Sequence, residues 1–254
     1  MSIDLHVHSE FSCDADVKMI DYINRAKELG LKHLYFTDHV DMQPIDPGYL
    51  YYNPRAYFEE YWKLKRTIET DDFQIHSGIE FGEPHLYPEN LKRLASYHYD
   101  VIIGSLHYIG KLYTHPGLPD LRDAKDFYKE YWRDMLKTVA NGGFDVLGHI
   151  DYPKRAYGYF LYEEKMLRNI FNILLDDGGV IEINTSALRK GNTETTPGRE
   201  LLELYKDCGG KFVTIGSDAH FLEDLAKDTD KARGVMVDVG LQEVMFLDRK
   251  MIIV

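Results

Sequence analysis

Histidine and carboxylate residues recur along this sequence in short clusters whose spacing could bind metal ions. His6 and His8 lie two residues apart near the start of the chain, and Asp218 and His220 repeat that spacing near its end. Alternation along a β-strand points both members of such a pair to the same face. Imidazole nitrogen combined with carboxylate oxygen suits Zn, Mn or Fe. The full set of candidate metal ligands is His6, His8, Asp14, His39, Glu80, His107, His149, Asp218 and His220.

The number of candidate ligands indicates more than one metal ion. Nine ligands are too many for one four-coordinate site, so we predict two or three adjacent divalent ions with at least one bridging carboxylate. Ionisable side chains directed into a shared interior cost free energy unless they pair or bind metal. Asp4 has the same strand phase as His6 and His8, and we expect it to orient one of these histidines.

Short apolar runs alternate with amphipathic helical patterns, and nearly every run ends in a ligand-type residue. We expect strands at residues 3–6, 33–37, 73–80, 101–105, 146–149, 180–184 and 213–217. Helices are expected at residues 17–29, 55–69, 89–96, 124–140, 163–175 and 199–207. This alternation predicts a parallel sheet with right-handed crossovers. Seven such units favour an α/β barrel, in which the carboxyl ends of the strands converge on one face.

Length and composition are those of an ordinary globular protein. The 254 residues are 44% hydrophobic and 28% charged, and we expect residues 1–254 to form a single domain, with a closing helix and a short strand at the C-terminus. We expect no signal peptide and no membrane span, since no apolar run approaches ~20 residues. The two cysteines, Cys13 and Cys208, are too few for a disulfide framework, which favours the cytoplasm. A net charge of −12 disfavours long nucleic acid as a partner.

Six short motifs, taken in order, resemble those of the polymerase and histidinol phosphatase (PHP) family. They run from residue 4 to residue 220 and read Asp4-Leu-His-Val-His-Ser, Phe36-Thr-Asp-His, Gly78-Ile-Glu, Gly104-Ser-Leu-His, Gly148-His-Ile-Asp and Gly216-Ser-Asp-Ala-His. The resemblance implies a distorted (βα)7 TIM-like barrel that holds up to three metal ions. Within the family, the chain looks most like the monofunctional histidinol-phosphate phosphatases, which implies hydrolysis of a small phosphorylated metabolite by a metal-bridging hydroxide.

The same resemblance implies how the candidate ligands are shared among the ions. One ion would be held by His6, His8, Glu80 and Asp218. Glu80 would bridge to a second ion at His107 and His149, and Asp14, His39 and His220 would hold a third. Other members of the family place a histidine where Asp14 stands. A carboxylate there is expected to change the charge balance around the third ion.

Two arginines are the expected substrate-binding residues. Arg155 follows the fifth expected strand and Arg189 follows the sixth, so both belong to the ligand-bearing face, where a guanidinium could bind phosphate oxygens and steady the developing charge. Their neighbours Lys154 and Lys190 are expected to be solvated. The leaving alkoxide needs a proton or a metal, and Asp14, His220 and a water on the third ion remain open as the source.

Other assignments remain open at this point. Another phosphoesterase activity within the family, on nucleotides, short oligonucleotides or phosphotyrosine, is the main alternative, followed by amide hydrolysis and by a non-catalytic metal-binding module. The sequence does not fix the metal or the oligomeric state. We expect structural roles for His33, His76 and His98. A place at the rim of the substrate pocket is considered for His85, His115, Tyr51, Tyr52, Tyr157 and Tyr159.

Overall fold

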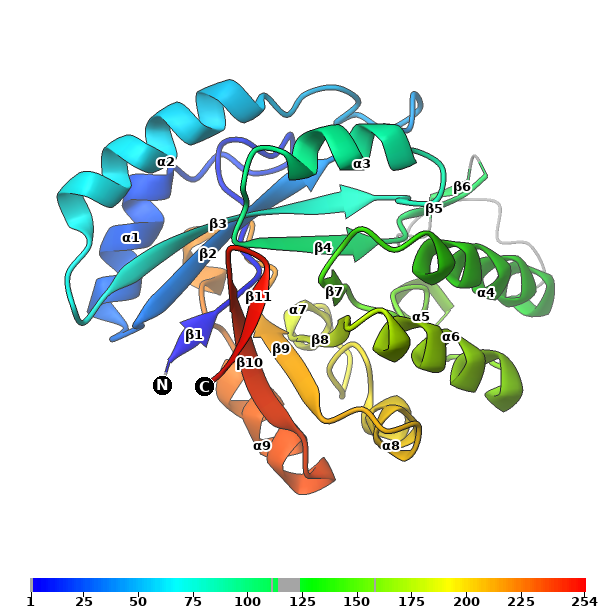
Figure 1. The fold of residues 1–254 in the computed structure, drawn as a ribbon. Helices are drawn as coiled ribbons and strands as arrows, with labels where there is room; N and C mark the ends of the chain where they lie inside the picture. The colour runs from blue at the N-terminus through cyan, green and yellow to red at the C-terminus, as the bar shows by residue number, and fades with distance from the viewer. Residues whose placement is uncertain (1, 111, 114–123, 158) are drawn as a thin grey trace.

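Parallel strands form the central sheet of the protein, and helices cover its outer side (Figure 1). The computed structural model describes residues 2–110, 112–113, 124–157 and 159–254. All seven expected strands are present, and neighbours in the chain order are hydrogen-bonded in parallel. They are β1 (Ile3–Asp4), β2 (His33–Val40), β3 (Gln74–Gly82), β4 (Val101–Ser105), β7 (Val146–Leu147), β8 (Val180–Asn184) and β9 (Phe212–Gly216).

The last of these strands returns to the first. The Leu5 N–H donates to the Ile215 carbonyl at 3.1 Å, and the Asp218 N–H donates to the His6 carbonyl at 2.7 Å. A further bond of 2.9 Å joins the His8 N–H to the carbonyl of Ala219. These contacts close the seven strands into a ring, which confirms the expected distorted (βα)7 barrel.

The six expected helices are all present, with ends within two residues of the expected ones. They are α1 (Met19–Glu28), α2 (Pro54–Ile68), α3 (Pro88–Ala95), α4 (Ala124–Asn141), α6 (Glu164–Asp176) and α8 (Arg199–Asp207). At the start of α2 the Asn53 side chain accepts hydrogen bonds from the Arg55 and Ala56 N–H groups, and Pro54 occupies the first turn. No helix among the described residues is long and apolar enough to cross a membrane.

Short elements that periodicity did not predict lie in the connections after the strands. Three are helical: α5 (Lys154–Tyr157) after β7, α7 (Ser186–Arg189) after β8, and the 3-10 turn η1 (Leu222–Asp224) after β9. The strands β5 (Tyr108–Ile109) and β6 (Leu112–Tyr113) pair with each other after β4. A single helical turn is too short to show a 3.6-residue pattern, so these segments are detected only in the structure.

The C-terminal segment closes the end of the barrel where the strands begin. It forms α9 (Thr229–Val239) and a hairpin of β10 (Gln242–Leu247) and β11 (Lys250–Ile253), one strand more than expected. Val244 and Phe246 of β10 pack in a buried cluster with Ile3, Val101 and other residues from the strand starts. The Tyr35 hydroxyl also donates to the Phe246 carbonyl at 2.7 Å. This end is sealed, so a site open to substrate has to form at the opposite end.

A histidine pair near the sealed end makes stability depend on pH. His33 Nδ1 and His76 Nε2 lie 2.9 Å apart, both side chains are buried, and burial lowers the pKa of both residues. The unfolded chain therefore binds more protons as pH falls below the ordinary histidine pKa of about 6.5. We expect the unfolding free energy to decrease there by up to about 1.4 kcal/mol per pH unit for each histidine.

Chemical denaturation of the wild type and His76→Gln between pH 7.5 and 5 measures this effect. The variant should show the shallower loss of stability with falling pH, and the exposed His98→Gln is the matched control. Lys65, Asp100, His33 and Tyr35 are the charged or titratable groups near His76, and all remain in the variant. Equal slopes for His76→Gln and wild type would contradict the assignment.

Candidate metal centre

The carboxyl ends of the strands bring all nine candidate ligands together, with Glu80 of β3 at the centre. Glu80 is 1% exposed, and its two oxygens face different histidines. Oε2 is 3.4 Å from His6 Nε2 and 3.0 Å from His39 Nδ1, whereas Oε1 is 2.7 Å from His149 Nε2. A carboxylate placed in this way can bridge two ions, as the family resemblance implied.

The first ligand group lies around Glu80 Oε2. His8 Nε2 is 3.6 Å from this oxygen and 3.3 Å from Asp218 Oδ1, and His6 Nε2 is 3.9 Å from the same Asp218 atom. Ligands about 2.1 Å from a tetrahedral ion are separated from one another by about 3.4 Å. The four side chains therefore have the spacing that one bound ion would require.

The second group lies around Glu80 Oε1. This oxygen is 3.3 Å from His107 Nε2 and 2.7 Å from His149 Nε2, and it accepts a hydrogen bond of 2.6 Å from the Ser105 hydroxyl. His107 and His149 are both buried. The serine bond holds Oε1 of the shared carboxylate in place, while Oε2 faces His6 and His39.

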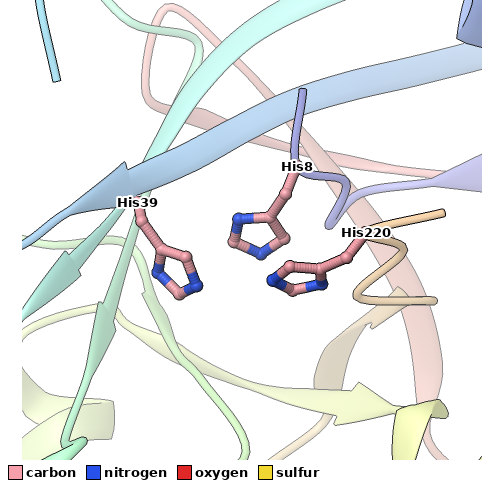
Figure 2. Close-up of side chains that lie close together, drawn as sticks. All are labelled: His8, His39 and His220. Atoms are coloured by element: carbon pink, nitrogen blue, oxygen red, sulfur yellow. The ribbon is translucent and has the colours of Figure 1, made fainter. Parts of the chain in front are cut away.

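Three imidazoles gather in the third group, from the loop after β1, from β2 and from the loop after β9 (Figure 2). The His8 ring lies 4.2 Å from that of His39 and 4.1 Å from that of His220, measured between centroids. Ligand nitrogens of all three come close enough to share an ion. Asp14 Oδ2 approaches the group at 3.2 Å from His220 and 3.6 Å from His39. Asp14 is thus in reach of a third ion, and His8 lies between the first and third groups.

Buried polar atoms without partners indicate that this cluster is built to bind cations. His6 Nε2, His8 Nε2, His39 Nδ1 and Glu80 Oε2 are all buried and make no hydrogen bond. Burial opposes ionisation of Glu80, but His6, His107 and His39 outweigh it and hold the pKa of this carboxyl well below its usual value. An ionised carboxylate amid convergent imidazole nitrogens is the donor set that Zn, Mn or Fe prefers. The residues present therefore fit several divalent ions.

Two groups that orient the ligands were missed by sequence interpretation. Glu182 of β8 accepts a hydrogen bond of 2.6 Å from His6 Nδ1, and its other oxygen accepts one of 3.1 Å from the His149 N–H. A Cβ at Gly216 would run into His6 and Glu182, so glycine leaves the space for this contact. In strand β8, Glu182 reads as an ordinary charged residue, and only barrel closure shows its role.

Asp38 orients His8 through a hydroxyl. Ser12 Oγ donates to Asp38 at 2.9 Å and lies 3.1 Å from His8 Nδ1. Asp4, which was expected to orient a histidine, instead accepts bonds from the Ser217 N–H at 2.8 Å and from the Ala226 N–H at 2.8 Å. That expectation was wrong because Asp4 points across to β9, where it fixes the backbone before Asp218.

Removing the Glu182 carboxylate is expected to weaken metal binding without removing a ligand. An imidazole held by a carboxylate is better oriented and more basic, and loss of such a partner costs about 10- to 100-fold in metal affinity. We expect Glu182→Ala to bind zinc or manganese weaker by that factor in chelator competition. Glu194→Ala, which removes an exposed carboxylate, is the control. Unchanged affinity in Glu182→Ala would show that β8 does not orient the site.

A cavity of about 420 Å³ opens above the ligand cluster. Asp14 and His220 line it, and so do the expected substrate arginines, Arg155 of α5 and Arg189 of α7. Arg155 donates to the Ser186 hydroxyl and lies 3.6 Å from Asp218 Oδ2, with its guanidinium 4.4 Å from the centre of the Tyr152 ring. The short helices α5 and α7 thus place two arginine side chains in the wall of the cavity above the metal ligands.

The structure agrees with some of the expectations for the remaining histidines and tyrosines and differs from others. His33 and His76 are buried and structural, but His98 is exposed in a left-handed turn, contrary to expectation. His85 Nδ1 lies 2.9 Å from the Thr138 hydroxyl of α4. The described residues that line the cavity do not include His85. They also do not include the four tyrosines considered for its rim, which are Tyr51, Tyr52, Tyr157 and Tyr159. His115 lies outside the described residues.

Comparison with known proteins gives consistent matches along the whole chain. A protein named histidinol-phosphatase from Lactococcus lactis subsp. lactis is 28% identical over 260 residues, covering 95% of this chain and 93% of that one. A protein named probable histidinol-phosphatase from Clostridium acetobutylicum is 28% identical over 263 residues, covering 99% of both chains.

Solved structures agree with these matches. The crystal structure of histidinol phosphate phosphatase from Lactococcus lactis subsp. lactis, complexed with Zn, L-histidinol and phosphate, superposes with a TM-score of 0.86 at 27% identity, covering 99% of this chain and 98% of that one. The PHP domain family model matches residues 4–186, which hold seven of the nine candidate metal ligands. On its sequence, its barrel and its clustered histidines, the chain belongs to the PHP domain family.

Proposed function

We propose that this protein is a metal-dependent phosphatase that hydrolyses L-histidinol phosphate to L-histidinol and phosphate, in the biosynthesis of histidine. One observation carries the proposal: full-length similarity to a phosphatase whose crystal structure holds Zn, L-histidinol and phosphate. The cavity supports it, because arginines flank one side of a histidine and carboxylate cluster. A phosphate monoester, which carries two negative charges and three terminal oxygens, fits such a lining.

The ligand residues divide among ions as their distances suggest. His6, His8, Glu80 and Asp218 would hold one ion, Glu80 with His107 and His149 a second, and His39 and His220 with Asp14 a third. Ions held there would act as Lewis acids toward the phosphoryl group and supply a water-derived nucleophile at neutral pH. The chain itself would position the ester: Arg155 and Arg189 bind phosphate oxygens and stabilise charge that develops on them.

Two residues at the cavity mouth are placed to handle the leaving group. His220 Nε2 lies 3.2 Å from Asp14 Oδ2, and both side chains reach solvent, 21% and 49% exposed. A leaving alkoxide needs a proton or a cation beside it. We propose that His220 and Asp14, as ligands of the third ion, would place that ion beside the departing oxygen, which takes its proton from solvent water at the cavity mouth.

The proposal extends to the setting of the reaction. The substrate is a small phosphorylated metabolite, and residues 1–254 act as one catalytic domain, supported by a sheet that runs from β1 to β11. The cytoplasm is the proposed compartment, and the two cysteines, Cys13 and Cys208, are both unpaired.

Release of inorganic phosphate from L-histidinol phosphate tests the function. Purified protein supplied with zinc or manganese should turn over this ester at least tenfold faster, in kcat/KM, than nucleoside monophosphates or phosphotyrosine. Robust turnover of another ester with failure on L-histidinol phosphate would refute the substrate while keeping the phosphatase class. Absence of turnover with every ester by metal-loaded protein would refute the phosphatase class itself.

A further inference from the structure

The cations that line the cavity differ in how their charge is balanced. Arg155 lies 3.6 Å from Asp218 Oδ2, and its guanidinium is bonded to Ser186. Arg189 Nε lies 3.2 Å from Asp224 Oδ1, and another of its nitrogens donates to the Ser217 carbonyl at 2.7 Å. Each arginine therefore has a carboxylate within 4.0 Å, although Arg155 Nε is buried and makes no hydrogen bond to the described residues.

Lys190 is the cation in the cavity lining that has no such partner. It follows α7 directly, where its N–H donates to the Ala187 carbonyl at 3.0 Å and turns the chain at the cavity wall. Within the described part of the chain, no carboxylate forms an ion pair with its ammonium. Its counterpart Lys154 behaves differently, because its Nζ is 2.7 Å from Glu194 Oε2 and it does not line the cavity.

The charges around Lys190 make the site attractive for an anion. Arg155 and Lys190 line the same cavity. Partial burial, followed by repulsion from Arg155, lowers the pKa of Lys190, although Asp218 and Asp14 oppose the shift. An anion entering this space would relieve that repulsion. The ammonium offers three donors on a flexible stem and can follow an oxygen as the ester is bound and cleaved.

We infer that Lys190 is a phosphate-binding residue of this cavity, which supplies the unbalanced positive charge that draws in the dianionic monoester and holds the product phosphate. This inference rests on the proposed phosphatase function but not on the identity of the alcohol part of the ester. It also modifies the sequence expectation for Lys190: the side chain is exposed, but toward the cavity rather than toward bulk solvent alone.

Binding of inorganic phosphate to the metal-loaded protein, measured by calorimetry, tests the inference independently of turnover. Loss of one charge-assisted contact predicts that Lys190→Met binds phosphate about tenfold more weakly than wild type. Lys190→Arg, which keeps the charge, should stay within about threefold, and Lys154→Met, the matched control, should not change. The salt dependence of phosphate binding should also be weaker in Lys190→Met, because one cation fewer is screened.

Kinetics then separate this inference from the proposed function. With p-nitrophenyl phosphate and L-histidinol phosphate, Lys190→Met should raise KM and change kcat little. A phosphate affinity of Lys190→Met within twofold of wild type overturns the inference, even if L-histidinol phosphate is hydrolysed well. If Lys190→Met binds phosphate weakly and the wild type hydrolyses only esters other than L-histidinol phosphate, the inference is supported and the proposed substrate is refuted. Phosphate binding by Lys190→Arg as weak as by Lys190→Met would also overturn it, because charge would not be the cause.

Discussion

Replacing Glu80 by glutamine is expected to lower kcat/KM at least about 10³-fold, an effect of about 4 kcal/mol on the activation barrier. Glu80 faces the first and second ligand groups with different oxygens, Oε2 3.4 Å from His6 Nε2 and Oε1 3.3 Å from His107 Nε2. Glutamine has nearly the same shape but no charge, and only one of its terminal atoms can coordinate a metal. The variant should lose at least one ion per chain, counted by elemental analysis.

A second carboxylate serves as the control for Glu80→Gln. Glu243 of β10 is also buried, but it pairs with Arg233 at 2.9 Å at the sealed end of the barrel. Glu243→Gln should keep its metal content and its turnover, although some stability will be lost with the ion pair. Full metal occupancy with unchanged turnover in Glu80→Gln would refute the bridging assignment.

Removing the metal ions is expected to lower the turnover rate at least about 10³-fold and to lower the melting temperature. The ions bind the folded chain alone, and at a free concentration 1,000 times Kd such binding stabilises a protein by about 4 kcal/mol. Without them the buried Nε2 atoms of His6 and His8 make no hydrogen bond. Chelation followed by dialysis, with thermal unfolding and phosphate release measured on the same sample, checks both effects.

Adding metals back shows which ions the ligands accept. Zinc or manganese should restore turnover and melting temperature together, because imidazole nitrogen suits these ions. Calcium should restore neither, since it takes oxygen ligands. Unimpaired turnover by protein with less than about a tenth of an ion per chain would rule out the metal-dependent reaction.

The barrel and the set of candidate ligands could be predicted from local sequence patterns. Strand and helix periods alternate clearly, and parallel strands in a barrel must end on one face, so His39, Glu80 and His149 could be assigned to that face without coordinates. Spacing of two at His6 and His8 fixed their common direction. These inferences hold because they depend on local periodicity and on strand polarity, which a sequence carries directly.

The grouping and orientation of the ligands depend on contacts between distant segments of the chain. Asp218 comes within 3.3 Å of His8 because β9 closes on β1, a contact between segments far apart in the chain. The same closure turns Glu182 toward the His6 ring and brings Asp4 to the Ser217 N–H. Similarly, two lysines beside two arginines look alike in sequence, yet Lys154 is paired and Lys190 faces the cavity. Side-chain partners across a barrel depend on register, closure and single helical turns, and no local pattern in the sequence specifies these.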